Sequence, residues 1–249
     1  MAPPRILFCG DPHGEFSNAL KAARRYPCLP VVLLGDLEPM RDLLQELKSI
    51  ADRLFWIHGN HDTDSEEAAV RVWHDDVARH SIHGRVVTLE GGLRLAGLGG
   101  VFRDSVWHPD PGAARGGQPS FWSPEQHARA TPRQDRWRGG PHRRHWSSIY
   151  PSVVEKLSKQ QCDILVLHEA PGYHPHGVAA LDDLARAMKA KVVVHGHHHD
   201  NLDSSASWSR QGFMTFGVGL RGVSAIDLDG NAEVVLPGEI DAARLVRLT

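Results

Sequence analysis

The chain has 249 residues, of which 41% are hydrophobic and 23% are charged, and its formal net charge is -2 at pH 7. This composition is typical of a globular protein and excludes bulk attraction to nucleic acid or to an anionic membrane. No apolar run reaches the roughly 18 residues of a transmembrane helix, and the N-terminal apolar run is too short for a signal peptide. We therefore expect a cytoplasmic protein with no membrane partner, whose 3 cysteines are free thiols.

The first hundred residues alternate strand-like and helix-like patterns. Apolar runs closed by turn residues predict strands at 5–9, 31–34 and 54–57. Helical spacing predicts helices at 15–26, 40–50 and 65–79, with Asp64 as the N-cap of the last one. This alternation of strands and helices favours a parallel sheet with helices on its faces.

A hairpin is predicted next, because the apolar runs at 86–89 and 93–98 flank Gly91-Gly92. Further along the chain, strands are predicted at 164–167 and 191–194, and helices at 152–160 and 178–188. The last part carries short alternating runs at 213–218, 223–228 and 232–236. Gly-containing turns separate these runs, which favours antiparallel strands of a second sheet.

Residues from about 102 to 148 differ from the rest of the chain, because they are rich in Pro, Gly, Arg, His and Trp and show no clean period. A long segment of this kind inside a domain is usually functional or disordered. Its tryptophans argue against plain disorder; they are Trp107, Trp122, Trp137 and Trp146. We expect one domain over residues 1–249, with this segment as an insertion that packs beside the functional site.

Five polar motifs directly follow predicted strands. They are Asp11-Pro12-His13, Gly35-Asp36, Gly59-Asn60-His61-Asp62, His168 and Gly196-His197-His198-His199. Ligands of open α/β sheets bind beyond the carboxyl ends of the strands, so these side chains are expected to converge. Carboxylates and imidazoles bind Mn, Fe and Zn well. Each motif alone is a common turn or a buried core histidine, but together they predict a metal site.

Read in order, the motifs resemble those of the calcineurin-like metallophosphoesterase superfamily, whose pattern is D-x-H, G-D, G-N-H-D/E, H and G-H-x-H. The resemblance covers residues 6–199. It implies an α/β fold, a four-layer α/β/β/α sandwich with two central mixed sheets flanked by helices. It also implies an enzyme, a phosphoesterase that binds two metal ions drawn from Mn, Fe, Zn or Ni.

The resemblance also implies a role for each matching residue. Asp11, His13 and His199 would hold the first metal, Asn60, His168 and His197 would hold the second, and Asp36 would bridge both. A hydroxide between the metals would attack phosphorus in line. His61 would not be a ligand, but would protonate the leaving oxygen or stabilise its developing charge. His195 and His198 are not expected to be ligands, and alternation along the last motif places His198 on the face opposite His197 and His199.

The chain departs from the superfamily pattern beside the catalytic histidine. Many relatives carry a second aspartate three residues after the bridging one, and it orients that histidine, whereas this chain has Pro39 there. Either Glu38 or Asp62 orients His61, or no residue does, and we name His61 and Asp62 as the catalytic residues. The serine/threonine phosphatase branch carries an Asp-Arg pair that Pro39-Met40 does not match, so a protein phosphatase is a less favoured alternative.

The insertion is expected to set specificity. Arginine suits phosphate and tryptophan stacks on bases, so a lid over the substrate and a solvated loop are both open interpretations. Arg103, Arg143 and Arg144 are the candidate substrate-binding residues, because they lie nearest the predicted core strands. The expected substrate is a small phosphodiester or phosphomonoester, nucleotides included. The alternatives are a nuclease on DNA or RNA strands, which the net charge disfavours, and an inert scaffold of the same fold.

Overall fold

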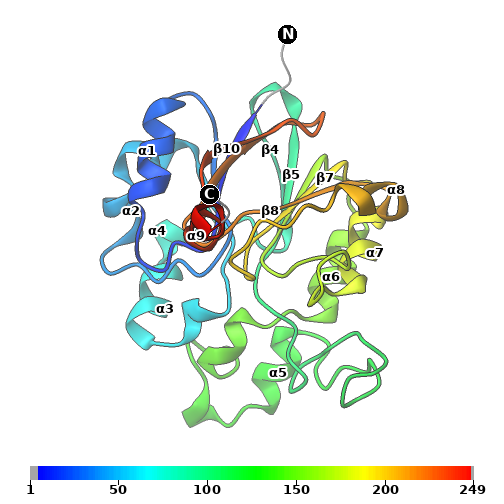
Figure 1. Cartoon of the computed structure of the whole chain (residues 1–249). Coiled ribbons are helices and arrows are strands. Elements are labelled where there is room, and N and C mark those ends of the chain that lie inside the picture. Colours follow the sequence, from blue (N-terminus) through cyan, green and yellow to red (C-terminus); the bar gives the residue numbers. More distant parts are fainter. Residues whose placement is uncertain (1–4, 248–249) are drawn as a thin grey trace.

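Two five-stranded sheets form the centre of the computed structural model, which describes residues 5–247 (Figure 1). The first sheet has the order β10-β9-β1-β2-β3. Its strands are β1 (Ile6–Cys9), β2 (Val31–Leu33), β3 (Leu54–Trp56), β9 (Val223–Ile226) and β10 (Ala232–Leu236). The three N-terminal strands are parallel, while β9 runs antiparallel to both β1 and β10, so the sheet is mixed.

The second sheet has the order β4-β5-β6-β7-β8. Its strands are β4 (Arg85–Thr88), β5 (Arg94–Leu98), β6 (Ile164–Leu167), β7 (Val192–His195) and β8 (Met214–Gly217). The predicted hairpin is confirmed, since β4 and β5 pair antiparallel, and the remaining strands pair in parallel. This sheet is therefore also mixed, and the predicted fold class is confirmed.

Alternation of side chains along the strands builds three apolar layers. Phe8, Val32 and Ile57 face the second sheet, where they meet Val166 and Val194. The next residues along the same strands face outward, so each central strand is buried on both faces and reads as a continuous apolar run. Helices α1 and α2 cover the outside of the first sheet, and α6 and α7 cover the outside of the second (Figure 1).

The α-helices are α1 (Ser17–Arg25), α2 (Leu43–Glu46), α3 (Glu66–Val72), α4 (Asp75–Ala78), α5 (Pro124–Ala130), α6 (Pro151–Ser158), α7 (Ala179–Ala187), α8 (Trp208–Gln211) and α9 (Glu239–Arg247). The 3-10 turns are η1 (Lys48–Arg53), η2 (His61–Thr63), η3 (Glu90–Gly92), η4 (Arg133–Asp135), η5 (Arg143–Ser147) and η6 (Ser205–Ser207). Of the helices in the described residues, none is long and apolar enough to cross a membrane.

Three sequence-based expectations about elements were wrong. The C-terminal strands do not form a sheet of their own, because β8 extends the second sheet in parallel and β9 inserts beside β1. The helix expected at 65–79 breaks after Val72, and Ser65 rather than Asp64 caps it by accepting from the amide of Ala68. The helix expected at 40–50 shortens to α2, which the Asp42 carboxylate caps, followed by η1.

The segment expected to be an insertion leaves the second sheet after β5 and returns at α6, and it lies at one end of the molecule (Figure 1). It contains α5, η4 and η5. Its η5 turn packs on η2, where the hydroxyls of Ser147 and Thr63 lie 2.7 Å apart. This contact places the segment directly beside the motif that contains Asn60 and His61.

Candidate metal centre

The motifs that follow β1, β2, β3, β6 and β7 are brought together across both sheets. The amide of His197 donates to Asp11 Oδ2 at 2.9 Å, and the amide of His61 donates to Asp36 Oδ1 at 2.8 Å. His168 Nε2 lies 3.1 Å from Asn60 Oδ1. Residues from distant parts of the chain therefore share one small volume, as the strand-end argument predicts.

Two groups of side chains in this volume have the spacing of metal ligands. The first group is His13, Asp36 and His199, and the second is Asp36, His168 and His197. Within each group the ligand-type atoms lie within 4.8 Å of one another. Asp36 belongs to both groups, which is the position that a bridging carboxylate needs. Asp11 and Asn60 border the groups through their contacts with His197 and His168.

The buried carboxylate oxygens in this volume are suited to bind a cation. Asp11 Oδ1 and Asp36 Oδ2 are buried and have no hydrogen-bond partner among the described residues. His13 Nε2 and His199 Nε2 face each other at 3.2 Å. Nitrogen ligands about 2.1 Å from one ion lie at about this separation from each other. The donor set of carboxylates, imidazoles and an amide oxygen also suits Mn, Fe or Zn.

Each of two histidines is held by a hydrogen bond on its other ring nitrogen. The Glu38 carboxylate accepts from His13 Nδ1, and the Leu34 carbonyl accepts from His168 Nδ1 at 2.7 Å. Such contacts fix the ring and turn Nε2 toward the site, which is how metal-binding histidines are usually oriented. Glu38 is thus a positioning residue for His13 and not for His61.

The backbone around the site is strained in a way that aims these side chains. Positive φ angles, which cost non-glycine residues energy, occur at Asp11, His13, Asp36, Glu38, His197 and His199. Their φ values lie between 31° at Asp11 and 70° at His197. The sharp reversals let D-x-H and H-x-H motifs present both of their side chains to the same volume.

Burial controls the protonation of the site. It lowers the pKa of His197 to about 3, assisted by neighbouring histidines, so this imidazole stays neutral and keeps a lone pair for a ligand bond. Burial alone would raise the pKa of Asp36, but His168 and the amide of His61 lower it overall, so Asp36 stays ionised. The same burial raises the pKa of Asp11, with Asp36 adding to it and His168 opposing it.

Gly59 lets the third motif pass against Asp36. A Cβ atom at position 59 would lie 2.1 Å from Asp36 Oδ1 and 2.5 Å from His168 Cε1. We expect Gly59→Ala to reduce metal content and to destabilise the fold by about 1–3 kcal/mol through overpacking. The measurements are metal analysis and thermal unfolding. Gly112→Ala is the control, since its nearest neighbour is 3.3 Å away, and equal behaviour of the two variants would contradict the close-packing argument.

His61 lies at the exposed rim of the site, with its ring centroid 5.4 Å from that of His13. Its Nδ1 donates to Asp64 Oδ2 at 2.6 Å. Partial burial lowers the pKa of His61, but the hydrogen bond to Asp64 and the charge of Asp36 raise it above its ordinary value. The protonated form, which has a proton to donate, is thereby favoured.

The expectation that Asp62 or Glu38 orients His61 was wrong. The fully buried Asp62 carboxylate accepts from the amides of Leu37, Glu38 and Gly59, so it ties two motifs together and does not reach the His61 ring. Sequence reasoning missed Asp64 because it assigned Asp64 to the helix cap. The available signal was its spacing of three from His61, which puts both side chains on one face of a helical turn.

Of the three candidate arginines, the structure brings Arg103 to the site, with Arg144 beside it. Arg103 donates to Ser147 Oγ at 3.2 Å. Burial and the charge of Arg144 lower the pKa of Arg103, while Asp64, Glu169 and Asp36 oppose that shift, so these charges lie within electrostatic reach of one another. Arg143 has no such contact among the described residues, and its Nη1 is buried without a hydrogen-bond partner there.

His195 is not a member of either ligand group, because hydrogen bonds occupy its ring. Its Nδ1 donates to the Gly196 carbonyl at 3.0 Å, and its Nε2 accepts from the Tyr173 hydroxyl at 2.8 Å. Both ring nitrogens are therefore engaged. His198 stacks on His174 with a centroid distance of 4.0 Å. Neither residue belongs to the two groups described above.

The chain is similar to known proteins in its sequence and in its fold. The model of the family described as calcineurin-like phosphoesterase matches residues 4–201. An uncharacterized protein of Haemophilus influenzae is 38% identical over 227 residues, which cover 91% of this chain and 95% of that protein. The crystal structure of TT1561 of Thermus thermophilus aligns over 93% of this chain and 98% of its own, with 16% identity and a TM-score of 0.56, and so shares the fold.

Proposed function

This chain belongs to the calcineurin-like phosphoesterase family, and from that premise we propose that it hydrolyses a small phosphodiester or phosphomonoester at the centre built around Asp36. Asp36 carries the proposal, because one carboxylate shared by two His-containing groups is what a dinuclear site requires. When bound, two metal ions supply an activated water and neutralise charge on the phosphate oxygens. The proposed ligands are Asp11, His13, Asp36 and His199 for one ion, and Asp36, Asn60, His168 and His197 for the other.

His61 supplies the proton that the leaving group needs. As the oxygen of water bonds to phosphorus and the water gives up a proton to solvent, the bond from phosphorus to the ester oxygen breaks, and that oxygen gains negative charge. The imidazolium of His61, held by Asp64, lies at the rim of the site and donates its Nε2 proton to this oxygen. The pair of His61 and Asp64 thus replaces the histidine–aspartate pair that Pro39 excludes.

The inert scaffold is disfavoured by the completeness of the centre. Such a scaffold has no need for buried carboxylate oxygens without hydrogen-bond partners, which cost free energy unless something binds them. Asp11 and Asp36 both carry one. The same reasoning gives no preference between a diester and a monoester, so the substrate test includes both.

The experiment is hydrolysis of bis-p-nitrophenyl phosphate and p-nitrophenyl phosphate by the purified protein with Mn²⁺. We expect turnover of at least one ester, which is lost on chelation and restored by added metal. A single-stranded oligonucleotide and a phosphopeptide run in parallel test the nuclease and protein phosphatase alternatives. Failure to hydrolyse any of the four, with two metals bound per chain, would remove the proposal.

Arg144 is proposed to bind the substrate phosphate beside the centre. We expect Arg144→Ala to raise KM for the hydrolysed ester about 10- to 150-fold, because a charge-assisted hydrogen bond contributes about 1.5–3 kcal/mol, and to leave kcat nearly unchanged. Arg129→Ala is the matched control, an exposed arginine of the same segment on α5. Steady-state kinetics decides this, and a fall in kcat with unchanged KM would contradict a binding role.

A further inference from the structure

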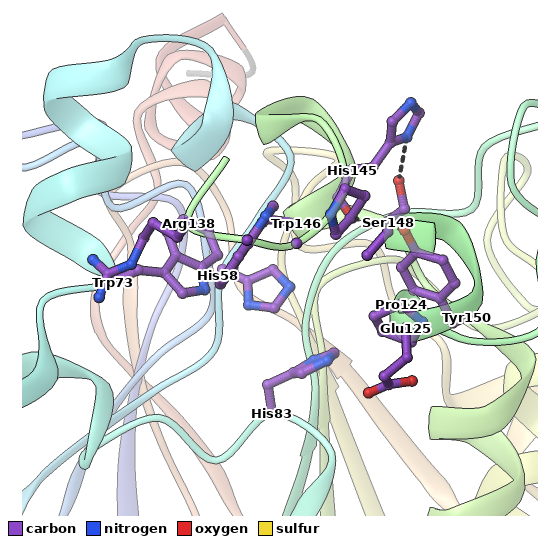
Figure 2. A pocket seen from close by; sticks show the side chains of 14 residues that line it. His58, Trp73, His83, Pro124, Glu125, Arg138, His145, Trp146, Ser148 and Tyr150 are labelled. Carbon is purple, nitrogen blue, oxygen red and sulfur yellow. Dashed lines mark hydrogen bonds between the residues drawn. The ribbon is translucent and has the colours of Figure 1, made fainter. Parts of the chain in front are cut away.

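A cavity of about 430 Å³ lies between the insertion and the core (Figure 2). Its walls come from several parts of the chain. Trp73 follows α3, His58 and His83 lie beside the core strands, and Trp146 and Tyr150 come from η5 and the residues after it. Further wall residues come from α5 and from residues 138–141. A cavity of this size, with several aromatic rings in its walls, is typical of a small-molecule site.

Three ring nitrogens in these walls lack hydrogen-bond partners. His58 Nε2 and Trp146 Nε1 are buried and have no partner among the described residues. His83 Nδ1 accepts from the Gly99 amide at 3.0 Å, and burial lowers the pKa of His83 to about 4, so the neutral ring carries its proton on Nε2. In the described part of the chain, no group accepts that proton.

The side chains of the walls bear on the kind of ligand. The walls hold one carboxylate, that of Glu125, and one guanidinium, that of Arg138, so they do not select a ligand of either charge. Aromatic walls favour a flat ring that stacks, and the donors Trp146 Nε1 and His83 Nε2 favour a ring with acceptor atoms on its edge.

The cavity and the metal centre share two segments of chain. His58 stands two residues before Asn60, on the loop that follows β3. Trp146 lines the cavity, while the next residue, Ser147, hydrogen-bonds to Thr63 on η2. A ring bound in the cavity would therefore contact the same turn that packs against Asn60 and His61.

From these observations we infer that the cavity binds a planar heteroaromatic ring of the nucleobase class. The ring is either the base of a nucleotide substrate or a separate nucleoside-type effector of the same centre. The assignment of the ring to a substrate's base rests on the proposed function, whereas binding of the ring in the cavity does not.

The test is calorimetric titration of the Mn²⁺-supplemented protein with adenosine, and with ribose 5-phosphate as a ligand that lacks the ring. We expect adenosine to bind and ribose 5-phosphate to bind more weakly. Trp146→Phe keeps an aromatic wall but loses the N–H donor, and it should weaken adenosine binding about 3- to 10-fold, the value of one hydrogen bond. Ala128→Leu, on α5, fills the cavity and should abolish binding.

Trp122→Phe is the matched control, since Trp122 belongs to the same segment, is 51% exposed and does not line the cavity. Its affinity for adenosine should equal that of the wild type. Unfolding curves of all variants show that the fold is kept. Absence of adenosine binding to the wild type, or undiminished binding to folded Ala128→Leu, would overturn the inference.

Hydrolysis assays with added adenosine separate the two sources of the ring. Competitive inhibition assigns the cavity to the substrate's base, and a change in kcat at constant KM assigns it to an effector. Either effect should vanish in Ala128→Leu. A protein that binds adenosine in the cavity but hydrolyses no ester would sink the proposed function while leaving this inference intact.

Discussion

Replacing His61 by alanine is expected to lower kcat about 10²- to 10⁴-fold for an ester with an alkyl leaving group, the usual contribution of a general acid. The loss should be much smaller for a p-nitrophenyl ester, because p-nitrophenolate is a stable anion that leaves without a proton. The metal content should not change, since His61 is outside both ligand groups. Parallel kinetics on the two esters, with metal analysis, measures all three quantities.

Asp64→Asn is expected to have a smaller effect than His61→Ala on the same reaction. Asparagine keeps an acceptor for His61 Nδ1 but removes the charge that favours the imidazolium, so we expect a loss of about tenfold on the alkyl ester, within the range of general-acid effects. Asp76→Asn is the control, because Asp76 is an exposed carboxylate that pairs only weakly with Arg79 at 3.9 Å. If His61→Ala lowered kcat equally on both esters and also lost metal, His61 would be a metal ligand and not the general acid.

Asp36→Asn is expected to cost activity about a thousandfold or more and to reduce bound metal from two ions to less than one per chain. Each metal contributes several kcal/mol of transition-state stabilisation, and Asp36 is the residue common to both groups. His199→Ala removes a ligand of one group only, so we expect about one metal to remain. Metal analysis after reconstitution with Mn²⁺ and rates on the best ester separate the two variants.

The control for this comparison is Asp52→Asn, an exposed carboxylate on η1 far from the motifs. It should keep full activity and both metals. Retention of two metals by Asp36→Asn, or identical metal loss in Asp36→Asn and His199→Ala, would exclude a bridging role for Asp36. Circular dichroism confirms that the variants remain folded.

Much of the centre was predictable because its signals are local. Buried strands need apolar runs, and residues such as Gly10, Gly35 and Gly59 end those runs where the chain must turn sharply. Parallel strands present their carboxyl ends at one edge, so side chains just beyond β1, β2 and β3 had to lie close together. For the same reason, the positions of the motifs at the strand ends predict which side chains gather around Asp36.

The sequence by itself therefore determined the strands of the N-terminal half, the hairpin and the set of side chains that converge. Only the tertiary structure decided that β8 joins one sheet and β9 the other, since short alternating strands pair with any open edge of suitable register. The tertiary structure also decided which carboxylate accepts the hydrogen bond of His61. The Asp62 carboxylate accepts from the backbone amides of Leu37, Glu38 and Gly59. Asp64, two residues later, therefore accepts from His61 Nδ1.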